Sequence, residues 1–218
     1  MKAILYDMDG LLIDSETLYG QVEHQLCAEF GREFTPEIQR KIMGTAPMES
    51  ISIMIRELDL PISPEILLDR RDRAMERKLK TDLEAMPGVE DILTTFDPLF
   101  DQLIVTTATT GYVKLVMQRL PIQHHFSLIQ TSDGITRGKP DPEIYITAMR
   151  KKGYRPSDCI VLEDSGNGVK AGKTAGCYVI AVPSEHSRFH NFDSADYIAL
   201  NLLDARDHIL LNFCTITV

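Results

Sequence analysis

The chain has 218 residues, about one and a half times a usual domain of ~150, so its length suggests one full domain and a smaller addition. Hydrophobic residues make up 44% of the chain and charged residues 25%, which is ordinary for a globular protein and excludes a disordered or collagen-like chain. The net charge of −9 provides no positive field for nucleic acid or anionic lipid, so we expect neither nucleic acid nor a membrane as a partner.

The start of the chain and its cysteines indicate a cytoplasmic protein. Only four apolar residues separate Lys2 from Asp7, too few for a secretion signal or a membrane span. The four cysteines lie far apart and form no Cys-x-x-Cys pair, so we expect reduced thiols. No pattern in the sequence bears on assembly, and a monomer is expected.

The first predicted elements are a strand at residues 3–6 and a helix that starts at Ser15. Apolar residues recur at every fourth position of this helix until Gly31, namely at Leu18, Val22, Leu26 and Phe30. Residues 7–14 lie between this strand and the helix and form a loop that begins with Asp7.

Helical patterns continue after Gly31. Thr35 and Ser63 each precede a proline, which is typical of a residue that caps the start of a helix. The predicted helices cover residues 36–43, 48–58 and 64–80. Residues 15–87 are therefore expected to form an all-helical segment.

From Pro87-Gly88 onward, short apolar runs alternate with helical patterns, which is typical of a parallel sheet covered by helices. Runs rich in β-branched residues predict strands at 103–106, 126–130, 159–162, 177–182 and 197–200. The sequence thus predicts an α/β fold with a sheet domain made of residues 1–14 and 88–218. Residues 15–87 form a helical insertion after its first strand.

Polar residues follow three of the predicted strands at the point where each ends. These residues are Asp7 and Asp9, Thr107 and Ala108, and Glu163 and Asp164. Lys139 lies in a loop just before a predicted helix. Ligands of open α/β sheets bind outside the carboxyl ends of the strands, so we expect these groups to converge at one edge of the sheet.

Two of the carboxylates suggest a metal. Asp7 and Asp9 are two residues apart and point to the same side while the chain stays extended, and Gly10 lets the backbone turn away. Neighbouring carboxylates resist double ionisation unless a cation lies between them. Magnesium prefers a few carboxylate oxygens together with substrate phosphate. Asp7, Asp164 and a backbone carbonyl near Asp9 would form such a half-open site.

The sequence resembles the phosphatase branch of the haloacid dehalogenase superfamily in four motifs, which occur in the order and spacing of that family. They are residues 7–15 (DMDGLLIDS), 105–108 (VTTA), 138–142 (GKPDP) and 163–169 (EDSGNGV). The resemblance implies a Rossmann-like core with an inserted helical cap. It also implies a magnesium-dependent phosphatase whose substrate is a small phosphorylated metabolite: a sugar, nucleoside or polyol phosphate.

The same resemblance implies a role for each polar residue. The nucleophile, which would form an aspartyl-phosphate, is Asp7, and the general acid and base is Asp9. The groups that bind phosphate are Thr107, Ala108 and Lys139, and those that hold magnesium are Asp7, Asp9 and Asp164, with Glu163 beside Asp164.

The helical insertion is expected to lie over the strand ends, where it would exclude water and select the substrate. Residues 42–63 most resemble the phosphatases of pseudouridine monophosphate and deoxyhexose phosphates. The alternative within the family is β-phosphoglucomutase. Where the mutase has a hinge histidine this chain has Tyr19, and the mutase's substrate-binding arginine falls near Pro47. Both departures favour the phosphatase.

A different class of enzyme is suggested by Gly166-Asn167-Gly168-Val169-Lys170-Ala171, which fits the fingerprint of a dinucleotide-binding loop after a strand. A nicotinamide-dependent oxidoreductase is therefore a distant alternative. Glu163 and Asp164 stand where a pyrophosphate would approach, and their negative charge opposes it. We expect the glycines to allow a tight turn behind Asp164 instead.

Overall fold

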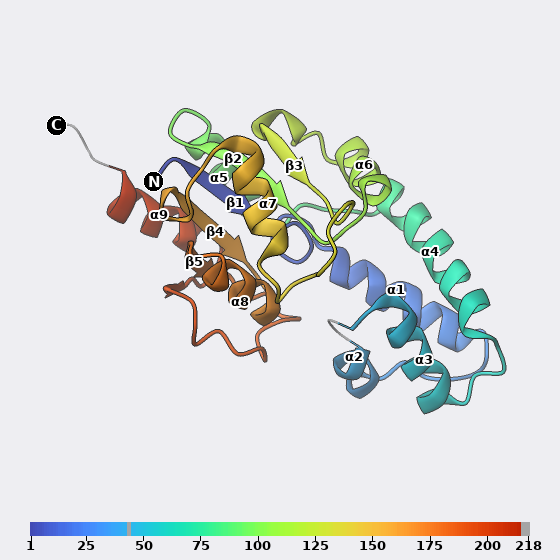
Figure 1. The fold of residues 1–218 in the computed structure, drawn as a ribbon. Coiled ribbons are helices and arrows are strands. Elements are labelled where there is room, and N and C mark those ends of the chain that lie inside the picture. Colours follow the sequence, from blue (N-terminus) through green and yellow to red (C-terminus); the bar gives the residue numbers. More distant parts are fainter. Residues whose placement is uncertain (43–44, 215–218) are drawn as a thin grey trace. The chain divides into compact units, whose positions relative to one another are not determined.

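The computed structural model describes residues 1–42 and 45–214, and the chain divides into two compact units (Figure 1). The sheet unit consists of Met1–Asp14 and Glu84–Val218, and the helical unit of Ser15–Leu83. Residues 84–87, which the sequence pattern placed in the insertion, belong to the sheet unit. The reason is that the returning chain bonds to the outgoing one: the Asp14 N–H donates to the Glu84 carbonyl at 3.1 Å.

The sheet is parallel, as predicted, and has six strands in the order β3-β2-β1-β4-β5-β6. The strands are β1 (Ala3–Tyr6), β2 (Asp101–Val105), β3 (Leu128–Gln130), β4 (Cys159–Glu163), β5 (Tyr178–Ala181) and β6 (Tyr197–Ile198). The chain runs from β1 outward to β3 on one side and then returns to β4 on the other. The strand order therefore reverses between β1 and β4, the position where open α/β sheets bind ligands.

Helices cover both faces of the sheet. They are α5 (Val89–Phe96), α6 (Thr110–Arg119), α7 (Glu143–Lys152), α8 (Gly166–Thr174) and α9 (Leu202–Phe213), with short 3-10 turns at Gln123–His125 and Pro156–Asp158. Figure 1 shows α7 and α8 in front of the sheet, where Ile144 and Val169 join Leu5 of β1 in one buried apolar cluster. All four residues of β1 are fully buried, which explains why the strand has no polar face.

The second strand begins earlier than its apolar pattern indicated. Its polar residue Gln102 is buried because three groups satisfy its side chain. The Gln102 amide donates to the Leu93 carbonyl at 3.0 Å and to Asp97 Oδ1 at 2.7 Å, and its Oε1 accepts from the Tyr6 hydroxyl at 2.7 Å. These bonds also bring α5 onto the face of β1 opposite α7, since Tyr6 and Leu5 point to opposite faces.

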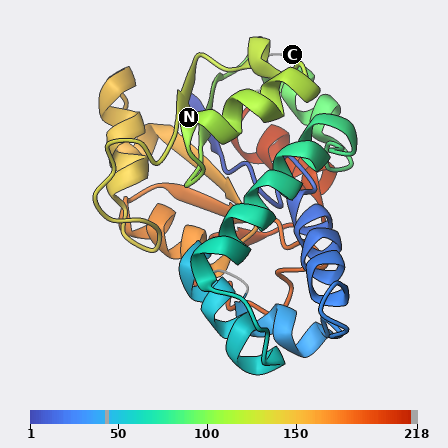
Figure 2. The ribbon, with the colours of Figure 1, turned by 90° about the vertical axis from the view of Figure 1, so that its right-hand side faces the viewer.

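The helical unit contains α1 (Ser15–Ala28), α2 (Pro36–Ile42), α3 (Pro47–Leu58) and α4 (Pro64–Thr81) in its described part. The predicted caps are present: Thr35 Oγ1 accepts from the Ile38 N–H, and Ser63 Oγ from the Ile66 N–H, each at 3.4 Å. The expected last residue of the second helix, Met43, lies outside the described residues. The longest helices, α1 and α4, pack against each other (Figure 2).

Two charged residues, Arg71 and Glu23, are buried inside the helical unit. The Arg71 guanidinium donates to Ser50 Oγ at 3.1 Å and lies 5.6 Å from the centre of the Tyr19 ring. Glu23 is 5% exposed, and burial raises its pKa to about 7, although the nearby charge of Arg71 acts in the opposite direction. Glu16 adds to the increase.

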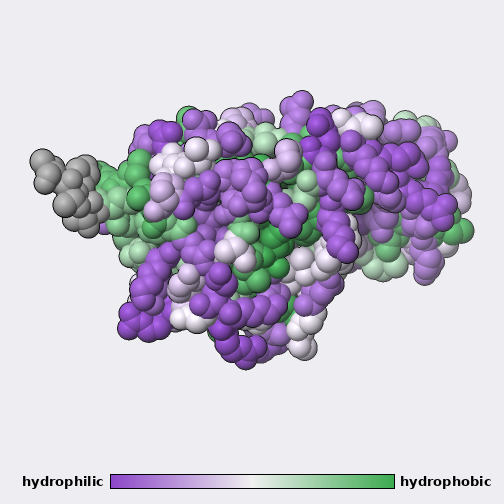
Figure 3. Space-filling view, turned by 90° about the horizontal axis from the view of Figure 1, so that it is seen from above, coloured by the Kyte–Doolittle hydropathy of each residue, from purple (hydrophilic) through white to green (hydrophobic). Residues whose placement is uncertain are grey.

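The surface is mainly hydrophilic on the face that Figure 3 shows, and hydrophobic side chains gather near the middle of the view and toward its left. Among the most exposed large hydrophobic residues are Leu200 and Leu211, at 86% and 82%. Within residues 1–42 and 45–214, no helix has the length and apolar character needed to cross a bilayer.

Candidate active site

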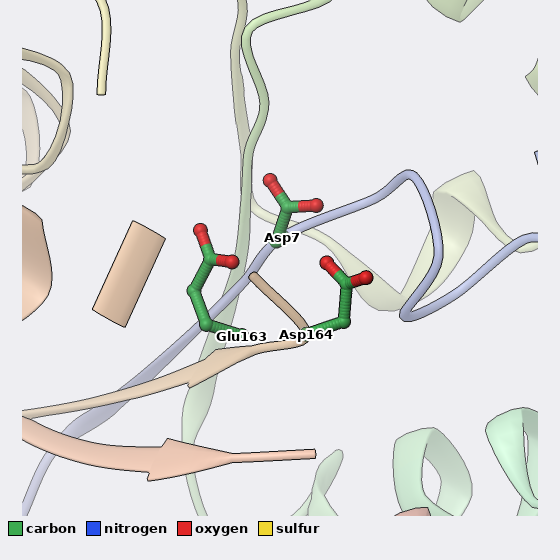
Figure 4. A group of neighbouring side chains, drawn as sticks. All are labelled: Asp7, Glu163 and Asp164. Atoms are coloured by element: carbon green, nitrogen blue, oxygen red, sulfur yellow. The ribbon is translucent and has the colours of Figure 1, made fainter. Parts of the chain in front are cut away.

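Three carboxylates meet at the point where the strand order reverses. Asp7 follows β1, Glu163 ends β4, and Asp164 comes next. Because β1 and β4 are hydrogen-bonded neighbours, the Asp7 N–H donates to the Leu162 carbonyl at 3.0 Å, which places Asp7 beside the end of β4. Oxygen atoms of the three carboxylates lie within 4.8 Å of one another (Figure 4). The convergence expected from the strand ends therefore occurs for these three residues.

Lys139 reaches this cluster from the loop between β3 and α7. Its ammonium donates to Asp7 Oδ1 at 2.5 Å, to Glu163 Oε1 at 2.6 Å and to the Val105 carbonyl at 3.2 Å. These bonds use its three protons. The Lys139 side chain is 7% exposed, so this positive charge lies inside the protein between two negative ones.

Burial and the neighbouring charges act differently on the pKa values of Asp7 and Lys139. It raises the pKa of Asp7 to about 7; Lys139 opposes the increase and Glu163 adds to it. Burial alone would lower the pKa of Lys139, but Asp7 and Glu163 hold it well above its usual value. Lys139 therefore stays charged, and its charge favours the ionised form of Asp7.

Glu163 is fully buried and is held from several sides. Its Oε1 accepts from Lys139 and from the Tyr145 hydroxyl at 2.7 Å, while its Oε2 accepts from the Ser165 N–H at 3.2 Å and hydroxyl at 3.0 Å. A Cβ on Gly168 would lie 1.8 Å from Oε1, so only glycine leaves room for this carboxylate. Both oxygens of Glu163 are thus engaged, and one of them accepts from Lys139.

Asp9 lies outside the group of three carboxylates. Its Oδ1 accepts a hydrogen bond from the Tyr112 hydroxyl at 3.0 Å. After Asp9 the chain turns at Gly10, where φ is +78° and a Cβ would lie 2.5 Å from Asp164 Oδ2. Gly10 therefore permits both the turn and the close passage of the backbone past Asp164. A metal contact through the backbone carbonyl near Asp9 stays a prediction.

The two residues predicted to bind phosphate after β2 are placed differently from each other. Thr107 is exposed. Ala108 is partly buried, and its N–H donates to the Thr106 hydroxyl at 3.0 Å. Both follow the strand next to β1, on the side away from β4. Their role in binding phosphate, like that of Lys139, stays a prediction.

The carboxylate cluster has the composition of a site for a divalent cation. Asp7, Glu163 and Asp164 bring three negative charges into a buried region where Lys139 provides one positive charge. A hard divalent ion would balance the remainder, and carboxylate oxygens are its preferred ligands. Since hydrogen bonds already occupy Glu163, Asp7 and Asp164 are the residues that fit magnesium best.

The glycines behind Asp164 have functions within the fold. The Gly168 N–H donates to the Ser165 side chain, which caps α8, at 3.0 Å. A Cβ on Gly172 would lie 2.9 Å from Val179 and 3.2 Å from Val161, so this glycine lets α8 pack closely on β4 and β5. Within the segment that resembles a dinucleotide fingerprint, a Cβ on Gly166 would lie 3.0 Å from the Asn191 carbonyl oxygen and one on Gly168 would lie 1.8 Å from Glu163 Oε1, so close approach accounts for both glycines.

Two residues of the site were not anticipated. Tyr145 belongs to a helical pattern that indicates a core position, and nothing in that pattern shows that its hydroxyl meets Glu163. Tyr112 follows Thr107 by five residues, at the start of the helix that the second motif leads into. That position near a strand end was the available signal, but the bond to Asp9 spans 103 residues of sequence.

Comparison with known proteins decides the family. A model of the haloacid dehalogenase-like hydrolase family matches residues 4–182. The chain belongs to this family. The match covers every motif on which the predicted resemblance was based.

Several of the relatives are named as phosphatases. The chain is 32% identical over 177 residues to a phosphorylated carbohydrates phosphatase of Thermotoga maritima, a match that covers 81% of this chain and 82% of the relative. It is 31% identical over 210 residues to a Drosophila melanogaster protein named as a probable pseudouridine-5'-phosphatase, covering 92% and 89% of the two. These matches confirm the predicted enzyme class, a phosphoric monoester hydrolase of the haloacid dehalogenase-like family.

One similar solved structure has the same fold and a name that states the alternative activity. It is that of a candidate beta-phosphoglucomutase from Thermotoga maritima, with 27% identity and a TM-score of 0.79, covering 91% of this chain and 94% of that one. The predicted α/β fold of this family is thereby confirmed.

Proposed function

We propose that this chain is a magnesium-dependent phosphatase that hydrolyses a small phosphate monoester through an aspartyl-phosphate on Asp7. The observation that carries the proposal is the environment of Asp7. Its carboxylate lies at the reversal of the strand order, 2.5 Å from the Lys139 ammonium and within a group of carboxylates suited to a divalent cation.

In the first step a carboxylate oxygen of Asp7 attacks the phosphorus atom, and the bond from phosphorus to the ester oxygen breaks. Lys139 favours the ionised, nucleophilic form of Asp7. The proton that the leaving alkoxide needs comes from Asp9, the nearest acid along the chain. The products are the free alcohol and phosphorylated Asp7.

In the second step water attacks the phosphorus atom of phosphorylated Asp7. Asp9, ionised after the first step, takes the proton of that water as general base. The bond between phosphorus and the Asp7 oxygen breaks, so that inorganic phosphate leaves and the carboxylate is restored. One aspartate thus serves as acid and then as base.

Magnesium bound at Asp7 and Asp164 would supply positive charge that stabilises the phosphate oxygens as charge builds on them. The chain's own part is to hold those two carboxylates. Glu163 and Lys139 fix one side of Asp7, and Gly10 leaves the space that Asp164 fills.

The relatives support a small phosphorylated metabolite as the substrate, in the range of sugar, nucleoside and polyol phosphates. The helical unit is proposed as the part that selects it. That the protein is a cytoplasmic monomer stays a prediction.

The second candidate is a phosphosugar mutase, which the solved structure from Thermotoga maritima favours. A mutase must retain a bisphosphate intermediate and suppress attack by water. Where the mutase uses a histidine this chain has Tyr19 in α1, and the mutase's arginine falls near Pro47 at the start of α3. Neither supplies a cationic contact, so hydrolysis is favoured over transfer.

A substrate panel tests the proposed function. Phosphate release is measured from p-nitrophenyl phosphate and from sugar, nucleoside and polyol phosphates, with magnesium and then with EDTA. We expect hydrolysis of at least one natural ester and its loss with EDTA. Conversion of a sugar 1-phosphate to the 6-phosphate without phosphate release would favour the mutase. Absence of any turnover on the whole panel would contradict the proposal.

A further inference from the structure

The hydroxyl of Tyr112 contacts the acid-base residue of the proposed mechanism. It donates to Asp9 Oδ1 at 3.0 Å, and the Tyr112 side chain is partly buried. Both residues belong to the sheet unit, so the contact lies within one compact body. Since Oδ1 accepts this bond, the orientation of the Asp9 carboxylate depends on Tyr112.

The helix that carries Tyr112 is anchored at its first turn. The Thr110 N–H donates to Asp133 Oδ2 at 3.0 Å, and the hydroxyls of Thr110 and Thr131 lie 3.1 Å apart. Thr109 caps the helix by accepting from the Tyr112 N–H at 3.4 Å. The start of α6 is thus fixed to the loop that follows β3, and the tyrosine is presented from a rigid element.

We propose that Tyr112 is a positioning residue for Asp9: its hydroxyl holds the carboxylate in the orientation that delivers a proton to the leaving oxygen. This inference rests on the proposed function, in which Asp9 is the general acid. It adds a residue that lies outside the four family motifs and acts through Asp9 rather than on the phosphate.

A positioning role predicts a dependence on the leaving group. An alkoxide leaves slowly unless it is protonated as the bond to phosphorus breaks, whereas p-nitrophenolate is stable enough to leave without a proton. A loss of acid catalysis therefore slows a sugar phosphate and spares p-nitrophenyl phosphate. A loss of binding or of folded protein slows both equally.

The experiment compares Tyr112→Phe and Asp9→Asn with the unchanged protein on both substrates, using a sugar phosphate that the unchanged protein hydrolyses. The quantity is kcat/KM, which covers every step up to phosphorylation of Asp7. General acid catalysis contributes about 10²–10⁴-fold, so a poorly oriented acid should cost about 10-fold or more on the sugar phosphate. On p-nitrophenyl phosphate, we expect Tyr112→Phe to change kcat/KM by less than about 3-fold, which corresponds to about 0.6 kcal/mol.

Tyr154→Phe is the matched control. The Tyr154 hydroxyl also donates to an aspartate, Asp101 Oδ2 at 2.6 Å, at the opposite end of the strands. Tyr154→Phe should leave kcat/KM unchanged for both substrates. Asp133→Ala is the second variant: it loosens the start of α6 from an exposed loop and should lower kcat/KM for the sugar phosphate selectively, by less than Tyr112→Phe.

The results distinguish the positioning role of Tyr112 from the acid role of Asp9. Equal losses on both substrates, or no loss on either, for Tyr112→Phe would overturn the positioning role. A Tyr112→Phe protein that does not fold leaves the decision to Asp133→Ala, where equal effects on both substrates would overturn it as well. If Asp9→Asn itself spares the sugar phosphate, the acid role of Asp9 in the proposed function fails instead.

Discussion

Lys139 is the residue on which the geometry of the site depends most. It lies between Asp7 and Glu163, with its side chain 7% exposed, and its ammonium is 5.0 Å from the centre of the Tyr145 ring. Removing one partner from a buried ion pair is costly because the remaining charges stay buried without compensation. Lys139 should therefore affect stability as well as catalysis.

We expect Lys139→Met to lower the free energy of unfolding by about 3–5 kcal/mol, as measured by urea denaturation. Phosphate release should be lost with it, since Asp7 would lose the positive charge that favours its ionised form. The control is Lys80→Met, which removes the ion pair of Lys80 with Glu76, where both side chains are about half exposed. Surface pairs contribute about 0–1 kcal/mol, so the control should be near neutral. Equal effects of the two substitutions would contradict the account.

The charged residues of the site could be predicted from the sequence, but the residues that hold their side chains in place could not. Asp7, Glu163 and Asp164 could be predicted because the ends of neighbouring parallel strands must meet. Tyr145 and Tyr112 could not, because a tyrosine at a helical core spacing has the same pattern whether its hydroxyl meets a carboxylate or solvent. Only tertiary structure distinguishes these cases.

At the scale of elements, the contact between β4 and the first turn of α8 shapes the site. Glu163 ends the strand, Ser165 caps the helix, and Gly168 leaves the space that the Glu163 carboxylate occupies. The turn is thus built around the side chain that orients Lys139. The glycine is required by close approach, since its backbone does not adopt a positive φ.

We expect Gly168→Ala to displace the Glu163 carboxylate. Overpacking of this kind costs about 1–3 kcal/mol, and phosphate release should fall because Lys139 loses its support. The matched control is Gly111→Ala, also in the first turn of a helix, where an added Cβ meets its nearest neighbour, Thr109 Oγ1, at 3.9 Å. This control should be neutral or more stable by up to about 1 kcal/mol. The measurements are the melting temperature and the rate of phosphate release of both variants. A Gly168→Ala protein with the stability and activity of the unchanged protein would contradict the interpretation.

Strand positions were predictable where apolar residues set them and less so where polar residues continue the strand. β2 extends back to Asp101 because Gln102 finds buried partners, a fact that no local pattern contains. In the other direction, the runs at 126–130 and 197–200 are longer than β3 and β6, although the N–H groups of Ser127 and Ala199 still donate to the Gln102 and Ala181 carbonyls. The parallel sheet and the helical insertion followed from the alternation of patterns, whereas the order of the strands comes from the structure.

At the scale of the whole molecule, the helical unit, Ser15–Leu83, contains a titrating group of its own. Glu23 is nearly fully buried, and its pKa is raised from 4.5 to about 7. A carboxyl whose pKa is higher in the folded state stabilises that state below its usual pKa of 4.5. The contribution is lost as the pH rises through 7.

Glu23→Gln should remove this dependence. One pKa unit corresponds to about 1.4 kcal/mol, so the shift represents up to about 3 kcal/mol between pH 4.5 and pH 8. The difference in melting temperature between Glu23→Gln and the unchanged protein, measured at pH 5 and pH 8, should move in favour of the variant at the higher pH. A difference that is the same at both pH values would show that Glu23 is ionised in the fold at pH 5.

The central claim is that Asp7 becomes phosphorylated during turnover. It is tested most directly by acid quench during the first turnover with magnesium and substrate, followed by mass spectrometry of the peptide that contains Asp7, with Asp7→Asn as the control. The account predicts a phosphoryl group on Asp7 that neutral hydroxylamine removes, as expected of an acyl phosphate, and its absence together with loss of phosphate release in Asp7→Asn. Undiminished phosphate release by Asp7→Asn, or a phosphoryl group on another residue, would contradict it.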